Sequence, residues 1–167
     1  IIVNIIIPLG GMSTDIYLPS LPAMSLHFGV TKAYIQLTVT FFMLSLGLSQ
    51  FIAGPISDAW GRKKLLVMAL MLQIVCVIGI LGSTSIIWII VFRFIQGMGA
   101  GFMMVPARAI INDVFDRETE KKHFNYLTIS FALSPIIAPF IGGYLQHYFG
   151  WQSNFYFIFV YIAVVLT

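Results

Sequence analysis

Long apolar segments alternate along the chain with short connections rich in charged residues, glycine and proline. A helix needs about 20 apolar residues to cross the hydrocarbon core of a bilayer, and most of the segments approach that length. The pattern predicts an all-α membrane protein with six membrane-spanning helices in one domain, residues 1–167. We expect the chain to be a piece of a longer protein, because it opens without methionine and runs out inside an apolar segment. The predicted helices cover residues 1–21, 34–57, 65–81, 86–111, 124–148 and 151–167.

Prolines shape two of these predicted helices. We expect the first to end at Pro19 and Pro22, because proline lacks a backbone N–H and disfavours helical structure in the residue before it. In the fifth, Pro135 and the segment 138–143, Ala-Pro-Phe-Ile-Gly-Gly, predict a bend with one smooth face. Such a face serves either as a contact that moves during function or simply for packing.

The composition excludes several classes of function. The chain has 59% hydrophobic and 9% charged residues, whereas a soluble domain has about 25% charged residues. No basic stripe with interleaved aromatic residues indicates nucleic-acid binding. A single cysteine, Cys76, and three histidines without metal-ligand spacing predict neither a disulfide framework nor a metal site. We therefore expect a lipid bilayer as the surroundings, with no nucleic acid, metal or catalytic residue.

The basic residues predict how the helices are oriented. Seven of the nine Lys and Arg residues lie in the connection between the second and third helices or near that between the fourth and fifth. Connections rich in Lys and Arg are cytoplasmic as a rule, which places the start of the chain in the cytoplasm as well. We expect a multi-pass protein of the plasma membrane. The seven residues are Arg62, Lys63, Lys64, Arg108, Arg117, Lys121 and Lys122.

A weak internal repeat accompanies this topology. A shift of about 89 residues aligns segment 54–61 with segment 143–150, so that glycine, aliphatic, aromatic and glycine positions coincide. The second helix then corresponds to the fifth, with the opposite direction in the membrane. This is the pattern of a three-plus-three inverted repeat. The alternative is a chance recurrence in a glycine-rich membrane chain.

Two ionisable residues fall inside predicted membrane helices. An ionisable side chain at depth costs at least about 2.5 kcal/mol and is usually kept for function. At 1.5 Å per residue, Asp15 and Arg93 both lie roughly 10 Å from the same membrane face, where they could interact directly or through water. Gln96 is one turn from Arg93 and shares its face. Such a site could couple to protons; alternatively, Asp15 caps a helix or faces water, and Arg93 is a structural hydrogen-bond donor.

Five segments carry recognisable motifs. Segment 54–63 reads Gly-x3-Asp-x2-Gly-Arg-Lys, segment 89–100 reads Ile-x3-Arg-x2-Gln-Gly-x-Gly-Ala, and segment 138–143 reads Ala-Pro-x2-Gly-Gly. Together they resemble the signatures of the major facilitator superfamily, apart from alanine where glycine usually precedes the helix-five proline. Segments 13–22 and 106–113 are similar to those of its Bcr/CflA-type drug/proton antiporters. Gln152, where arginine commonly follows the tryptophan, is a second departure.

The resemblance implies a twelve-helix transporter, of which this chain is the amino-terminal six-helix half. It implies that Asp15, with Arg93 and Gln96, serves proton coupling and substrate recognition, and that Arg62 joins Asp58 to Asp113 in a cytoplasmic latch. Asp58 would lie at a helix start in the carboxy-terminal half. The gate residues are Gly54, Asp58, Gly61, Arg62, Lys63, Arg108 and Asp113, and the helix-five antiporter residues are Pro135, Ala138, Pro139, Gly142 and Gly143.

These observations predict a transporter that exports drugs or small amphipathic compounds in exchange for protons by alternating access. The expected partners are a small-molecule substrate, the bilayer of a bacterial inner membrane and the missing carboxy-terminal half, with protons as the coupling ion and no cofactor. A metabolite or siderophore exporter of the same fold is the alternative. A membrane-embedded enzyme is a remote one, because the chain has none of the hydrolase or protease motifs. A half-size assembly that dimerises is a further possibility.

Overall fold

The chain folds into a bundle of helices. The computed structural model describes residues 2–114 and 117–166, and this part of the chain contains no strand. The prediction of an all-α protein is thereby confirmed. The elements are α1 (Ile2–Asp15), a 3-10 helix η1 (Leu18–Ser20), α2 (Leu21–Phe28), α3 (Lys32–Trp60), α4 (Arg62–Leu81), α5 (Ile86–Val114), α6 (Arg117–Phe149) and α7 (Gln152–Leu166).

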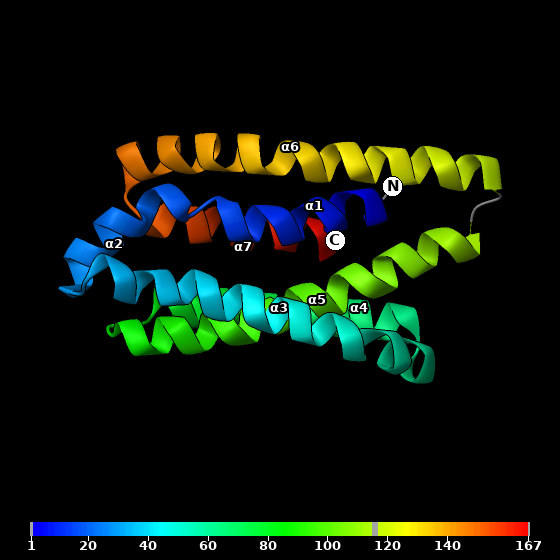
Figure 1. Ribbon diagram of the computed structural model, residues 1–167, viewed down its shortest axis with the longest axis horizontal. Coiled ribbons are helices and arrows are strands. Elements are labelled where there is room, and N and C mark those ends of the chain that lie inside the picture. The colour runs from blue at the N-terminus through cyan, green and yellow to red at the C-terminus, as the bar shows by residue number, and fades with distance from the viewer. Residues whose placement is uncertain (1, 115–116, 167) are drawn as a thin grey trace.

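The long helices run beside one another along the long axis of the molecule (Figure 1). In that view α6 forms one layer, α1 and α7 a second, and α3, α4 and α5 a third. The most extensive contact is between α3 and α5, followed by α4 with α5 and α1 with α6. Helix α5 therefore connects the layers, since it also packs against α1.

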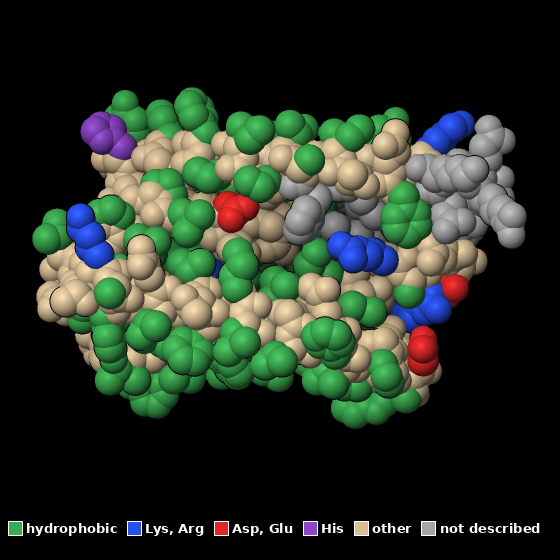
Figure 2. All heavy atoms as spheres, viewed as in Figure 1, with side chains coloured by type: hydrophobic (Ala, Val, Ile, Leu, Met, Phe, Trp, Pro, Cys, Tyr) green, Lys and Arg blue, Asp and Glu red, His purple; other side chains and the backbone are tan. Residues whose placement is uncertain are grey.

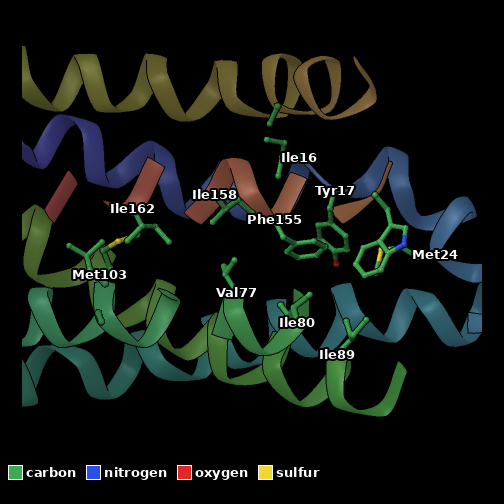
Figure 3. Close-up of a cluster of buried hydrophobic side chains, with 14 of the residues drawn as sticks. Ile16, Tyr17, Met24, Val77, Ile80, Ile89, Met103, Phe155, Ile158 and Ile162 are labelled. Atoms are coloured by element: carbon green, nitrogen blue, oxygen red, sulfur yellow. The ribbon is translucent and has the colours of Figure 1, made fainter. Parts of the chain in front are cut away.

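The buried core lies between the layer of α1 and α7 and the layer of α4 and α5. Figure 3 shows Phe155 and Ile158 of α7 facing Val77 and Ile80 of α4. Tyr17, between α1 and η1, lies beside Phe155 with 5.6 Å between the ring centroids. This packing holds the segment after α1 against the rest of the bundle.

Four of the described helices, α3 to α6, are long and apolar enough to cross a membrane. Helices α1 and α7 have 14 and 15 residues, fewer than the roughly 20 that a perpendicular crossing needs. The count of six crossings therefore stays a prediction. The ends of two predicted helices, Ile1 and Thr167, lie outside the described residues.

The first predicted helix is wrong at its carboxyl end. Helix α1 stops at Asp15 rather than at residue 21, and the chain continues through η1 and α2. The physical reason is Pro19, whose ring would clash with the Asp15 carbonyl and whose nitrogen cannot donate to it. Pro22 lies in the first turn of α2, where a missing N–H does no harm. The two prolines thus break one long helix into a helix, a turn and a short second helix.

The remaining helices are mostly longer than predicted. Helix α3 begins at Lys32 because Thr31 caps it, accepting a hydrogen bond from the Tyr34 N–H. Helix α6 begins at Arg117 rather than residue 124. It continues through Pro135 and Pro139 without a break, and Figure 1 shows no sharp kink where a bend was expected. Neighbouring helices can satisfy the backbone groups that a proline frees in a membrane helix.

The helix ends that flank the two basic connections lie at the same end of the bundle. The turn between α3 and α4 lies there, as do the end of α5 and the start of α6, and α3 starts at the other end (Figure 1). An ion pair between Arg62 and Asp113 joins the start of α4 to the end of α5. Arg117 and Lys121 are outside the residues whose side chains the structure describes. The grouping of positive charge agrees with the sequence, whereas the side of the membrane that it faces stays a prediction.

The two glycines aligned by the internal repeat have the same conformation. Gly61 ends α3 with φ of 93°, and Gly150 ends α6 with φ of 82°, values that side chains rarely adopt. Each donates its N–H to the carbonyl four residues earlier, that of Ser57 or Gln146. Helices α3 and α6 also run in opposite directions (Figure 1). These equivalences support the inverted repeat over a chance match.

Small residues allow α3 and α5 to approach closely. A Cβ on Gly97 would collide with the Ser45 hydroxyl oxygen and the Phe42 carbonyl oxygen. One on Gly101 would collide with the Ser49 hydroxyl oxygen. Such stripes of small residues are typical of tightly packed membrane helices.

We expect Gly97→Ala and Gly101→Ala each to destabilise the full-length protein by about 1–3 kcal/mol, because the added methyl group forces the helices apart. Gly47→Ala is the matched control, since no atom lies within 4 Å of the position its Cβ would take. It should be neutral or stabilising, because alanine favours a helix over glycine. The measurement is the midpoint of thermal unfolding in detergent; equal effects of all three changes would contradict the prediction.

Candidate functional site

Arg93 is the centre of the candidate site. Its side chain is fully buried in the middle of the bundle, although it carries a charge. Nη1 donates one hydrogen bond to the Ser13 carbonyl oxygen at 3.0 Å and another to Gln96 Oε1 at 2.8 Å. Because Ser13 belongs to α1 and Arg93 to α5, the guanidinium connects these two helices.

Two aromatic rings cover the guanidinium of Arg93. Its Cζ lies 4.2 Å from the ring centroid of Tyr17 and 4.1 Å from that of Phe42. A cation over an aromatic face is stabilised, and by more when water is excluded. No carboxylate forms an ion pair with Arg93 within the described part of the chain, so the rings and two neutral oxygens stabilise its charge.

Further hydrogen bonds connect this cluster to α4 and α3. Gln73 of α4 donates from Nε2 to the Gln96 carbonyl oxygen at 3.0 Å. The Tyr17 hydroxyl lies 3.3 Å from Thr38 Oγ1 of α3. Nε and Nη2 of Arg93 are buried and have no acceptor among the described residues. The site therefore holds the arginine firmly on one side and leaves donors available on the other.

Asp15 lies beside this cluster without being paired to it. It is the last residue of α1, two positions after Ser13, and its side chain is partly exposed. The direct ion pair with Arg93 that the sequence allowed is not formed among the described residues. Arg93 instead binds the backbone of the turn that carries Asp15. The two predicted residues are thus neighbours through α1.

Sequence reasoning missed the roles of Tyr17 and Phe42. One signal was available, because the buried face of α3 follows a helical repeat through Thr38, Phe42 and Ser45. That repeat places Phe42 on the face packed against α5. The pairing of this face with Arg93 depends on how α3 and α5 pack, and the spacing of residues within one helix does not specify it.

Two of the predicted helix-five residues, Gly142 and Gly143, face the break after α1. A Cβ on Gly142 would collide with the Ile16 carbonyl oxygen, and Ala138 is fully buried. A Cβ on Gly143 would lie 3.9 Å from Pro19, whereas Pro135 is exposed and Pro139 partly buried. The smooth face of α6 thus supports the segment from Ile16 to Pro19, within this chain.

The predicted cytoplasmic cluster is formed in part. Arg62 pairs with Asp113 and donates a hydrogen bond to the Ala109 carbonyl oxygen. Asp58 is exposed and has no ion pair among the described residues, so the predicted link from Arg62 to Asp58 is absent in this structure. Three other predicted gate residues take no part in this ion pair. Gly54 is half-buried, and Lys63 and Arg108 are exposed.

The described side chains contain no group of three or more His, Cys, Asp or Glu residues that could hold a metal ion. The chemistry of the site is therefore that of hydrogen bonds, one buried cation and a neighbouring carboxyl. Figure 2 shows the face between α6 and α3, where charged side chains lie in a hollow flanked by apolar ones.

Comparison with known protein families shows which family the chain belongs to. The family described as Major Facilitator Superfamily matches residues 4–167. The chain belongs to the Major Facilitator Superfamily. The motifs in segments 54–63 and 89–100 are thus features of a family member, and the buried arginine of α5 belongs to the second.

Several relatives in the Major Facilitator Superfamily are similar over most of the chain. It is 32% identical over 154 residues to the uncharacterized MFS-type transporter YdgK of Bacillus subtilis, covering 91% of the chain and 38% of that protein. It is 30% identical over 162 residues to Multidrug resistance protein D of Escherichia coli, covering 96% and 41%. It is 29% identical over 144 residues to the Bicyclomycin resistance protein homolog of Haemophilus influenzae, covering 86% and 36%. The chain spans about two fifths of the length of these curated relatives.

Proposed function

We propose that the full-length protein is a secondary transporter that exports drugs or small amphipathic compounds across the cytoplasmic membrane in exchange for protons. Membership of the Major Facilitator Superfamily supports a transporter over a membrane-embedded enzyme. The names of the relatives, which refer to multidrug and bicyclomycin resistance, support drugs as the substrate class. The chain described here supplies the amino-terminal half of the machinery.

The observation that carries the proposal is the buried Arg93, which is bound to the backbone of α1 and has no ion pair among the described side chains. Keeping a charge at membrane depth is expensive, so such a residue is normally retained for function. Nε and Nη2 of Arg93 have no acceptor among the described residues, and Asp15 is two residues from its partner Ser13. The proposal requires that a shift at the end of α1 bring the carboxylate and the guanidinium together.

The coupling step follows from the charges. With Asp15 protonated, Arg93 keeps its bonds to the Ser13 carbonyl and Gln96, as in this structure. When Asp15 loses its proton, the carboxylate attracts either Arg93 or a cationic group of the substrate. Substrate and proton then compete for the same site, which is the requirement for exchange.

A second half is required for alternating access. Large apolar side chains are exposed along α3 and α6, among them Phe51 of α3 and Ile136 and Phe140 of α6, which are 84%, 70% and 83% exposed. Extended exposed apolar faces mark contacts with lipid or with other helices. We infer that part of this surface packs against the carboxy-terminal half, and that rocking of the two halves opens the central site to each side in turn.

The test uses full-length protein in sealed vesicles with an imposed proton gradient and bicyclomycin as the probe. We expect bicyclomycin to move against the direction of proton flow, and collapse of the gradient with an ionophore to stop it. Asp15→Asn should uncouple the two fluxes, because an amide cannot exchange a proton. Lys32→Gln, a change at the exposed start of α3, is the control and should keep coupling. Transport that ignores the gradient would contradict the function, and full coupling in Asp15→Asn would contradict the assignment of Asp15.

A further inference from the structure

A surface groove lies where α3 turns into α4. Its volume is about 660 Å³, within the roughly 300–1,000 Å³ of typical small-molecule sites. The turn between α3 and α4, which lines the groove, is at the end of the bundle where α5 ends (Figure 1). The groove combines apolar and basic side chains, contributed by Trp60, Val67 and Met68 and by Arg62, Lys63 and Lys64.

The basic side chains of the groove differ in whether they are paired with an acidic side chain. Arg62 is engaged by Asp113 and by the Ala109 carbonyl. Lys63 and Lys64 are exposed and form no ion pair with the side chains that the structure describes. Two lysines thus stand at the rim of an apolar groove with charge available for an anion.

The apolar part of the groove continues along the membrane. Exposed apolar side chains follow one face of α4 from Val67 and Met68 through Met71 and Val75 to Ile78. A helix with this composition lies among acyl chains, and Trp60, which is 58% exposed, is of the type that concentrates at the membrane interface. Lysine side chains at such a position extend toward the lipid headgroups.

We propose that this groove binds one anionic phospholipid, with its phosphate between Lys63 and Lys64 and an acyl chain along Val67, Met68 and Met71. Basic pockets at the cytoplasmic side of transmembrane helices recognise such headgroups through charge. The apolar lining selects a lipid over free phosphate, because a free ion would leave the groove between Trp60 and Met68 uncovered. The site lies at the end of α4 remote from Arg93 and needs no assumption about the transported substrate.

The test measures quenching of Trp60 fluorescence in full-length protein reconstituted into bilayers. The contribution of Trp60 is obtained by subtracting the fluorescence emission of the Trp60→Phe variant from that of the wild-type protein. Phosphatidylglycerol brominated in its acyl chain is compared with equally brominated phosphatidylcholine, each titrated into unlabelled phosphatidylcholine. We expect half-maximal quenching at a lower mole fraction of the anionic lipid, with about a fivefold preference for each lysine, corresponding to about 1 kcal/mol.

Matched variants separate the site from general surface charge. Lys63→Gln with Lys64→Gln should abolish the preference, whereas Lys63→Arg with Lys64→Arg should keep it. Lys32→Gln with Lys122→Gln removes the same two charges from exposed positions outside the groove, and should also keep it. Equal quenching by the two brominated lipids in wild-type protein, or a preference unchanged by the glutamine pair, would overturn the proposal. Absence of quenching by either lipid would do the same, since another part of the protein would then cover the groove.

Discussion

Arg93→Lys is expected to lower the rate of proton-driven export by about 10- to 150-fold while the protein still folds. Lysine keeps the charge but has no planar group to lie between Tyr17 and Phe42, and its ammonium cannot reproduce the geometry of the guanidinium. Losing a charge-assisted hydrogen bond costs about 1.5–3 kcal/mol, which is the size of the expected loss in rate. The measurement is the initial rate of bicyclomycin transport in sealed vesicles under a fixed proton gradient.

A second variant distinguishes a functional arginine from a structural one. Arg93→Met should also abolish transport, yet the full-length protein should be at least as resistant to heat as the wild type. Replacing buried charged groups with well-packed apolar side chains of similar volume is often neutral or stabilising, and Arg93 has no ion pair among the described side chains. Thermal unfolding in detergent provides the comparison. Wild-type transport by Arg93→Lys, or a strongly destabilised Arg93→Met, would contradict the role assigned to Arg93.

Gly142→Ala is expected to be the most destabilising single-methyl change in segment 138–143 of α6, at about 3 kcal/mol, the upper end for overpacking. The added Cβ would collide with the carbonyl oxygen and carbon of Ile16. These are backbone atoms of the break after α1 and cannot rotate away as a side chain can. The displaced turn carries Asp15 and the Ser13 carbonyl that binds Arg93, so transport should fall together with stability.

The neighbouring glycine supplies the control for this prediction. A Cβ on Gly143 would lie 3.9 Å from the Pro19 Cβ, an ordinary van der Waals contact. Gly143→Ala should therefore leave the midpoint of thermal unfolding unchanged or slightly raised, since alanine favours a helix over glycine. Similar midpoints for the two alanine variants would show that α6 does not support the break after α1 in the way proposed.

The helices themselves could be predicted from the sequence to within a few residues for the most part. Their lengths follow from runs of apolar residues. The position of Gly61 between α3 and α4 follows from the sharp basic turn between two such runs. The break after Asp15 was missed, although Pro19 contains the reason for it: a proline disrupts the carbonyl four residues earlier as well as the residue before it. The effect of Pro19 on Leu18 alone does not reveal this break, whereas its effect on the Asp15 carbonyl does.

The candidate site could be predicted in its charged members and in Gln96, which binds Arg93. Asp15 and Arg93 stand out because ionisable residues are rare in apolar segments. Their relation could not be read from depth alone, since depth fixes the level along the membrane normal and leaves the direction of each side chain open. The structure directs Arg93 to the Ser13 carbonyl and between two aromatic rings.

What the sequence determines by itself is therefore the membrane setting, the grouping of positive charge at one end and the motifs of the family. These depend on composition and on the order of residues along single helices, which are local properties. The tertiary structure alone decides that Arg93 lies between Tyr17 and Phe42, with no carboxylate paired to it in the described part of the chain, and that Gly142 supports the break after α1. Such contacts join residues far apart in the chain, and they arise because small residues at helix crossings set how closely and at what rotation the helices pack.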